Sequence, residues 1–67
     1  MQANLLKGKI ISAGYTQNML AKELNMSPNS LSSKINGRSE FTCDEVVAIC
    51  EILSIVDNNE KAIIFLQ

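Results

Sequence analysis

Closely spaced signals for the start and end of helices divide this chain of 67 residues into short segments. Near the N-terminus, apolar residues recur at helical spacing, at Ala3, Leu6, Ile10 and Ala13. Gly14 follows them and is typical of a helix end. A helix end this early in the sequence predicts several short helices rather than one long helix.

Two N-cap residues start the next two helices. Thr16 can accept a hydrogen bond from the first turn of a helix of about eight residues, which ends before the interruption at residues 25–27. Ser27 is a second N-cap residue, and Pro28 loses no hydrogen bond at the first helical position. We expect this third helix to span residues 28–36 and to end at Gly37.

The clearest start signal is a capping box at residues 42–45. In it, Thr42 caps the amide of Glu45, and the Glu45 side chain reaches back to the amide of Thr42. Phe41 and Val46 flank the box as a hydrophobic staple, and the helix is expected to end near Ser54. The predicted buried stripe of this fourth helix consists of Cys43, Val46, Ile49, Cys50 and Leu53.

A weaker capping signal, Asp57 followed by Glu60, predicts a short fifth helix that reaches Leu66. Because this terminal run is β-branched and aromatic, a strand is the alternative for the segment. Repeats and linkers are missing, so residues 1–67 are predicted to form one all-α domain of five helices.

The composition argues against an enzyme. The chain has no histidine, so the commonest general base and the imidazole metal ligand are missing. Cys43 and Cys50 lie on one predicted helix, about 10 Å apart along its axis, which is too far for a disulfide. Two thiols are also too few for a tetrahedral zinc site. We expect no catalytic residues, no metal and no cofactor, and we expect both cysteines to pack in the core.

The chain begins without a basic segment that runs into an apolar stretch, and nowhere do about 18 apolar residues run together. The lack of a disulfide framework agrees with a reducing compartment. These features predict a soluble cytoplasmic protein without a membrane partner.

A net charge of −1 conceals a division between the two halves of the chain. Residues 1–38 carry five basic side chains against one acidic side chain, a net charge of +4, whereas residues 39–67 carry one against six, a net charge of −5. A basic half can face a polyanion while the acidic half faces away, so the charge balance permits nucleic-acid binding.

The second and third helices meet the geometric demands of a helix-turn-helix unit, two short helices joined by a tight turn. The small Ala21 suits a close helix crossing, and Asn25 is the best substitute for glycine where the turn needs a positive φ. The side chains expected to hold the pair together are Leu20, Leu24, Met26 and Leu31.

The stretch from Gln17 to Ser27, continued by residues 36–38, resembles the phage Cro and repressor helix-turn-helix family, also called the XRE-like family. The resemblance covers the chain in helix order, with the motif at about residues 17–36. It implies a compact, lambda-repressor-like DNA-binding domain that regulates transcription. Two positions depart from the family pattern: Asn25 stands where glycine is usual, and Lys34 stands where the third helix usually has an apolar residue.

In this family the third helix enters the major groove with its N-terminal residues on base edges. Helical geometry selects the same face, because turning Leu31 and Ile35 inward directs Asn29 and Ser33 outward. Asn29 can bond bidentately to adenine, whereas serine hydroxyls both donate and accept. The predicted base-reading residues are Asn29, Ser30, Ser32 and Ser33.

Phosphate contacts are expected at both ends of the motif. Gln17 opens the second helix, where free amides and the helix dipole attract a phosphate, and Asn18 lies beside it. After the third helix, the backbone of residues 36–38 and the Arg38 guanidinium resemble the family's second phosphate clamp. The Lys34 ammonium is expected to be free for a phosphate. The predicted set is Gln17, Asn18, Ser27, Lys34, Asn36, Gly37 and Arg38.

Proteins of this type contact one half-site per monomer, so the resemblance implies a homodimer, at least on DNA. The candidate dimer interface lies in the apolar C-terminal half, at Ile52, Ile64, Phe65 and Leu66. The predicted function is a sequence-specific transcriptional regulator, a repressor rather than an activator, that binds operator DNA without a small-molecule ligand. The alternative is a small helical protein-interaction module, an anti-repressor or antitoxin-like adaptor on the same fold, which the low basicity favours.

Overall fold

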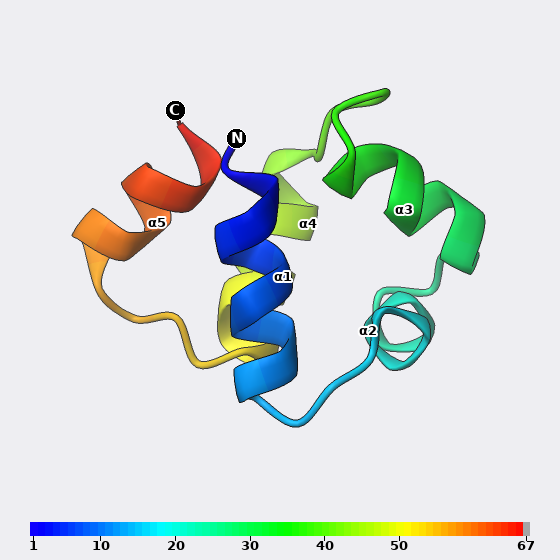
Figure 1. The fold of residues 1–67 in the computed structure, drawn as a ribbon, viewed down its shortest axis with the longest axis horizontal. Helices are drawn as coiled ribbons and strands as arrows, with labels where there is room; N and C mark the ends of the chain where they lie inside the picture. Colours follow the sequence, from blue (N-terminus) through cyan, green and yellow to red (C-terminus); the bar gives the residue numbers. More distant parts are fainter. Residues whose placement is uncertain (67) are drawn as a thin grey trace.

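The computed structural model describes residues 1–66, and these form helices joined by turns without any strand. The helices are α1 (Ala3–Ser12), α2 (Gln17–Glu23), α3 (Pro28–Ile35), α4 (Cys43–Ile52) and α5 (Asn58–Phe65). In Figure 1, α1 and α4 occupy the middle, with α5 on one side and the α2–α3 pair on the other. The all-α prediction is confirmed, and the C-terminal segment is a helix rather than a strand.

Three of the helices begin at the N-caps that the sequence predicts. Thr16, Ser27 and Thr42 each accept a hydrogen bond from the amide three residues further on. At the start of α4 the capping box is complete, because the Glu45 carboxylate also accepts from the Thr42 amide at 2.9 Å. Local hydrogen bonding at these residues therefore sets where α2, α3 and α4 start.

The start of α5 differs from the prediction. Asp57 caps the helix by accepting from the amide of Asn59 at 2.9 Å. Glu60 does not complete a capping box and instead pairs with Lys9 of α1, at 2.8 Å between Nζ and Oε1. The amide of Gln2 donates to the carbonyl of Ile64 at 2.7 Å, so the two ends of the described chain lie together.

Helices α1 to α4 all end in a Schellman turn. In each, the residue that follows the C-cap lies at positive φ, and the amide of the next residue donates to a carbonyl five residues back at 2.8 to 3.0 Å. The residues at positive φ are Gly14 (80°), Asn25 (56°), Gly37 (81°) and Ser54 (57°). The first three stand where the sequence predicts a helix end or a turn. The sequence also predicts a helix end near Ser54, but serine is not typical of a left-handed backbone, so the positive φ there is a finding of the structure.

The core is one apolar cluster to which every helix contributes, and no polar side chain is buried within residues 1–66. Its members are Leu6, Ile10, Leu20, Ala21, Leu31, Ile35, Ile49, Cys50, Leu53, Ile55 and Ile64. The prediction that Cys43 belongs to this core is wrong. Cys43 is exposed at the first position of α4, whereas the buried residues of that helix, Ile49 and Cys50, lie further along it. Ala13 is also exposed, because α1 ends one residue before it.

Candidate nucleic-acid interface

The α2–α3 pair is a tightly packed unit. Leu20 and Ala21 of α2 and Leu31 and Ile35 of α3 are completely buried, and the two helices pack directly against each other. Asn25 takes the left-handed conformation that lets the chain turn between them. The buried Ala21 fits the expectation that a small side chain allows the two helices to approach closely.

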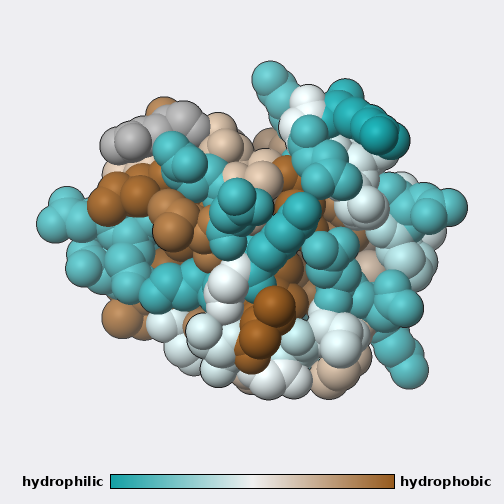
Figure 2. Space-filling view, in the orientation of Figure 1, coloured by the Kyte–Doolittle hydropathy of each residue, from teal (hydrophilic) through white to brown (hydrophobic). Residues whose placement is uncertain are grey.

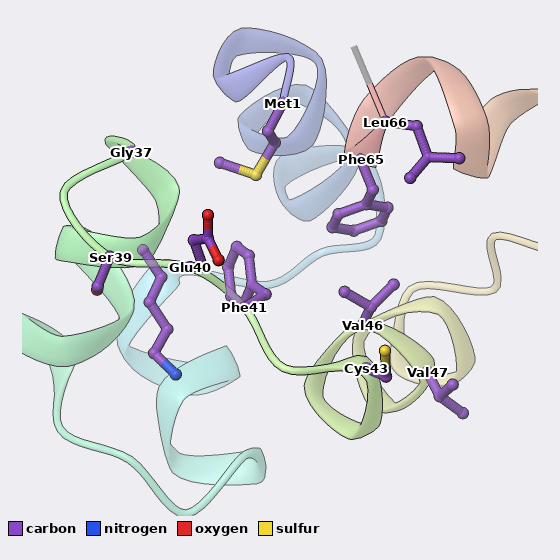
Figure 3. A pocket seen from close by; sticks show the side chains of 11 residues that line it. Met1, Gly37, Ser39, Glu40, Phe41, Cys43, Val46, Val47, Phe65 and Leu66 are labelled. Carbon is purple, nitrogen blue, oxygen red and sulfur yellow. The ribbon is translucent and has the colours of Figure 1, made fainter.

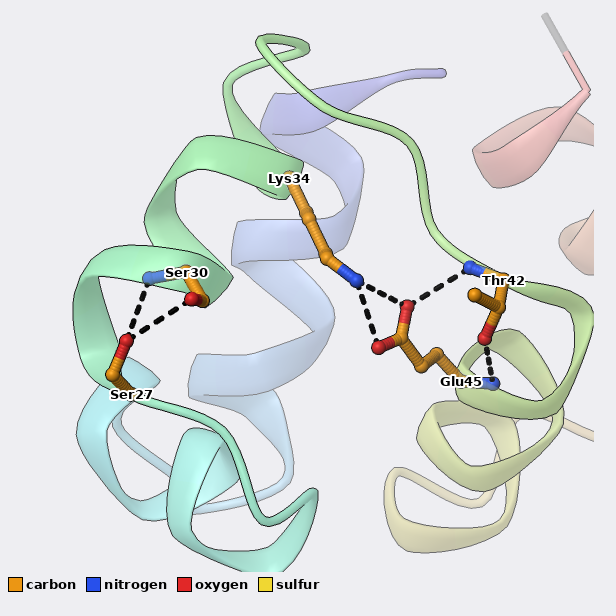
Figure 4. A network of polar contacts seen from close by, with 5 residues as sticks. All are labelled: Ser27, Ser30, Lys34, Thr42 and Glu45. Carbon is orange, nitrogen blue, oxygen red and sulfur yellow. Dashed lines mark hydrogen bonds and ion pairs between the residues drawn. The ribbon is translucent and has the colours of Figure 1, made fainter.

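The outer face of α3 is polar, and its N-terminal part is the most open. Asn29 and Ser30 are exposed, whereas Ser32 and Ser33 are half-buried. The hydroxyls of Ser27 and Ser30 lie 3.1 Å apart and bond to each other (Figure 4). Of the four predicted base-reading residues, Asn29 is therefore the one whose side chain is exposed and makes no hydrogen bond within residues 1–66.

Ser33 is less exposed than a position opposite Leu31 and Ile35 should be. At the end of α3, the Schellman turn brings the chain back to the backbone of this residue. The amides of Arg38 and Ser39 both donate to the Ser33 carbonyl, at 2.9 and 3.4 Å. The returning loop therefore lies at the C-terminal end of α3, next to Ser33.

The same turn corrects the expected phosphate clamp. The amides of Asn36, Gly37 and Arg38 all donate to carbonyls of the preceding turn. The backbone of this turn is therefore already hydrogen-bonded, and only side chains remain to meet a phosphate. Arg38 is exposed and makes no ion pair within residues 1–66, whereas the Asn36 side chain donates to the Ser32 hydroxyl at 3.3 Å.

At the other end of the motif, the structure places the predicted residues at the start of α2. Asn18 is exposed, Gln17 is half-buried, and neither side chain makes a hydrogen bond to another part of residues 1–66. Ser27 is exposed as well, but its hydroxyl is already occupied as the α3 cap. The predicted phosphate residues therefore lie on both sides of the α2–α3 pair without forming one cluster of charge.

Lys34 is not free for a phosphate, and this prediction is wrong. Its Nζ lies 2.6 and 2.8 Å from the two carboxylate oxygens of Glu45, so the pair joins α3 to α4 (Figure 4). The side chains are only 18% and 22% exposed. The hydrogen bond from Lys34, followed by the one from the Thr42 amide, holds the pKa of Glu45 below its ordinary value.

A surface groove of about 660 Å³ lies between the N-terminus, the end of α3 with the loop that follows it, the start of α4 and the end of α5 (Figure 3). Phe41 and Phe65 form its floor, with their rings edge to face and their centroids 6.2 Å apart. Leu66 stands at the rim and is 82% exposed. Of the predicted interface residues, Phe65 and Leu66 therefore line an open apolar surface.

The other two predicted interface residues lie elsewhere. Ile64 is only 2% exposed and belongs to the core, so its assignment to an interface is wrong. Its side chain turns inward because α5 packs against α1, where the Gln2 amide also donates to the Ile64 carbonyl. Ile52 is half-buried at the end of α4 and does not line the groove.

Residues 2–66 match a family described as a protein of unknown function, DUF739. The chain belongs to this family. No curated protein and no solved structure matches it.

Both cysteines of this DUF739 domain, Cys43 and Cys50, are free thiols. Burial raises the pKa of the Cys50 thiol, so this thiol stays protonated, and Cys43 lies open at the groove. No three side chains from cysteine, aspartate and glutamate gather as metal ligands within residues 1–66. In the same part of the chain, no helix has the length and apolar character needed to cross a membrane.

Sequence reasoning missed one residue of this region. Glu45 was identified only as part of a capping box, although its carboxylate also holds Lys34. The available signal was the departure at Lys34 itself: a lysine at a position expected to be apolar needs a partner or an exit to solvent. The partner lies 11 residues along the chain, on another helix.

Proposed function

We propose that this domain is a sequence-specific DNA-binding regulator of the Cro or repressor type, with α3 as the helix that enters the major groove. The observation that carries the proposal is the exposed polar N-terminal face of α3, at Asn29 and Ser30, on a helix held rigidly by fully buried contacts to α2. In Figure 2 the side of the molecule that carries α3 is largely hydrophilic, without a continuous apolar patch. Such a surface suits the groove of a duplex.

Short side chains on this face favour close approach to base edges. Asn29 can donate to and accept from adenine in a bidentate pair, and Ser30 can bond to several bases. Pro28 occupies the first helical position, so it brings no unsatisfied amide to the interface. Arg38 supplies the cation that positions the helix on the phosphate backbone, a contact that carries no sequence information.

Assembly belongs to the same proposal. One α2–α3 unit reads one half-site, so two copies on a palindromic operator bind more tightly than one. We assign the contact between the copies to the apolar groove and its rim at Phe65 and Leu66. A dimer on an operator in the cytoplasm represses transcription by excluding polymerase.

Selection of bound sequences from a pool of random duplexes tests the proposal directly. We expect recovery of a palindrome whose half-sites lie about one helical turn apart. Asn29→Ala should then weaken binding to the selected site by about 1–3 kcal/mol and change non-specific binding little. Arg38→Ala should weaken both by similar amounts.

A protein-interaction adaptor gives the opposite outcome in the same experiment. It enriches no sequence and binds no mixed duplex, so a salt titration finds no binding to follow. Equal loss of specific and non-specific binding in Asn29→Ala would instead move the reading face away from the start of α3.

A further inference from the structure

The Lys34–Glu45 ion pair joins α3, the helix proposed to read DNA, to α4. Lys34 is the only charged side chain of α3, whose sequence is PNSLSSKI. Its ammonium contacts both oxygens of the Glu45 carboxylate, and one of these oxygens also accepts from the Thr42 amide at 2.9 Å. In the proposed function α3 faces DNA. Its single charge, on Lys34, is neutralised by Glu45 of α4.

The pair is held firmly from the side of α4. The Glu45 carboxylate cannot swing away without giving up the capping box at the start of its helix. The Lys34 stem is also mostly covered, since only 18% of its side chain is exposed. Release of the ammonium toward a phosphate would therefore break the contact that joins the two helices.

We propose that Glu45 is a specificity-determining residue that withholds the Lys34 charge from the DNA backbone. This inference rests on the proposed function. Sequence-independent binding comes almost entirely from cations that neutralise phosphates. By pairing Lys34 within the domain, Glu45 leaves α3 to bind through its polar face and keeps non-specific attraction weak.

The charge pattern of the whole domain points the same way. Of the five basic side chains in residues 1–38, Lys34 pairs with Glu45 and Lys9 pairs with Glu60, so two are compensated by the acidic half. A purely structural role for the Lys34–Glu45 pair would give a different result. If Glu45 only supported α3, its loss would weaken DNA binding, whereas release of a masked charge strengthens it.

The experiment compares Glu45→Gln with the double variant Lys34→Met/Glu45→Gln. The amide oxygen introduced by Glu45→Gln keeps an acceptor for the Thr42 amide, and the methionine of the double variant keeps the apolar length of the lysine stem. The double variant also has the net charge of the wild type. Binding to a mixed-sequence duplex is measured by fluorescence anisotropy between about 50 and 200 mM salt.

We expect Glu45→Gln to bind the mixed duplex roughly three- to tenfold more tightly at low salt, with a salt slope steeper by about 0.9. Binding to the selected operator should rise less, so the ratio of specific to non-specific affinity falls. The double variant should show the wild-type slope. A double variant whose slope is shallower by about 0.9 would mean that Lys34 already contacts a phosphate in the wild type, which overturns the inference.

Two results separate failure of this inference from failure of the proposed function. If the wild type binds no duplex, the proposed function and this inference are both refuted. If the wild type binds but Glu45→Gln binds no more tightly, only the masking by Glu45 is refuted. Circular dichroism of each variant shows whether its fold is intact.

A measurement on the wild type needs no variant at all. Limited acetylation followed by peptide mass spectrometry compares Lys34 with Lys22, which is exposed on α2. We expect Lys34 to react several-fold more slowly, because a paired ammonium must lose both its partner and a proton before it reacts. Equal rates would show that the pair is open in solution and would also overturn the inference.

Discussion

The α2–α3 and α4–α5 regions each consist of two short helices, but they differ in how many of their apolar side chains are buried. The turn between α2 and α3 spans only residues 24–27, and the helices bury their large aliphatic residues against each other. Helices α4 and α5 are joined by residues 53–57, only one residue more, but several apolar side chains in this region remain exposed to solvent. The exposed ones are Val47, Val56, Ile63 and Leu66.

This difference separates two kinds of surface. The α2–α3 pair turns mostly polar side chains outward, and Met19 is the one exposed large apolar side chain in residues 17–35. A mostly polar surface suits contact with a hydrated polyanion. The α4–α5 region leaves an apolar groove open, and such a surface is more favourable when another protein covers it. We infer that the two halves serve different contacts, which the following variants test from the largest expected effect to the smallest.

The deepest side chain of the α4–α5 region should matter most to stability. Ile64→Ala is expected to lower the free energy of unfolding by about 2–5 kcal/mol, because it leaves a cavity in the core. Ile63→Ala, on the exposed side of the same helix turn, should cost less than about 1 kcal/mol. Urea denaturation of both measures the contrast. An equally small loss in both variants would contradict the burial of Ile64.

In the α2–α3 region, an enlarged side chain should disrupt the packing between the helices. Ala21→Leu is expected to cost about 1–3 kcal/mol, since a fully buried site between packed helices has no room for it. Ala13→Leu is the control, because Ala13 is exposed. An unchanged melting temperature for Ala21→Leu would show that α2 and α3 do not meet closely there.

The helix starts and the helix crossing could be predicted from the sequence. The N-caps Thr16, Ser27 and Thr42 were predictable because each bonds to an amide only three residues away. Burial of Ala21 followed from helical spacing and from the demands of a tight turn. Such features depend on neighbours along the chain, so the order and the starts of the helices were accessible without the structure.

The main errors involve residues distant in sequence. Glu60 does not cap α5 as expected but pairs with Lys9, 51 residues away. Ile64 faces the core, and its carbonyl accepts a hydrogen bond from Gln2 near the N-terminus. In the candidate site, the face containing Asn29 was predictable from helical geometry. The pairing of Lys34 was not, because it depends on how α4 packs beside α3.

The capping box gives a smaller and more local test of the α4 region. Thr42→Ala is expected to cost about 1 kcal/mol, because the amide of Glu45 loses its acceptor at the exposed start of the helix. Thr42→Ser keeps a hydroxyl and should retain most of the stability. Thermal melts followed by circular dichroism distinguish the two. Equal loss in both variants would assign the effect to the threonine methyl group.

The Glu45 carboxylate should also make stability depend on pH. Its pKa in the folded state lies below the ordinary value of 4.5, mainly because of the hydrogen bond from Lys34. The unfolded chain therefore takes up the proton first, so the stabilisation is complete above about pH 4.5 and declines as pH falls through the folded pKa.

Urea midpoints measured from neutral pH down to about pH 3 test this expectation. Glu45→Gln cannot titrate, so its stability should fall less steeply than that of the wild type in the same acid range. The other carboxylates are present in both proteins and provide the common background. Parallel curves would mean that the pair contributes nothing to folding in solution.

The last variant should leave the fold almost unchanged and affect assembly alone. Phe65 packs edge to face against Phe41, so a charge there would disturb the monomer as well as any interface. Leu66 at the rim of the groove is 82% exposed, and Leu66→Glu should change stability by less than about 0.5 kcal/mol. Burying that charge between two copies without a partner is unfavourable, so the variant should lose self-association.

Val56→Glu provides a matched control, because Val56 is 83% exposed but does not line the groove. Sedimentation across a concentration series, with and without a palindromic duplex, measures assembly in the wild type and both variants. We expect the wild type and Val56→Glu to dimerise on the duplex and Leu66→Glu to occupy each half-site independently. Equal cooperativity in all three proteins would move the contact away from the groove. Independent occupation by the wild type would instead leave the apolar surface of the α4–α5 region to a different protein partner.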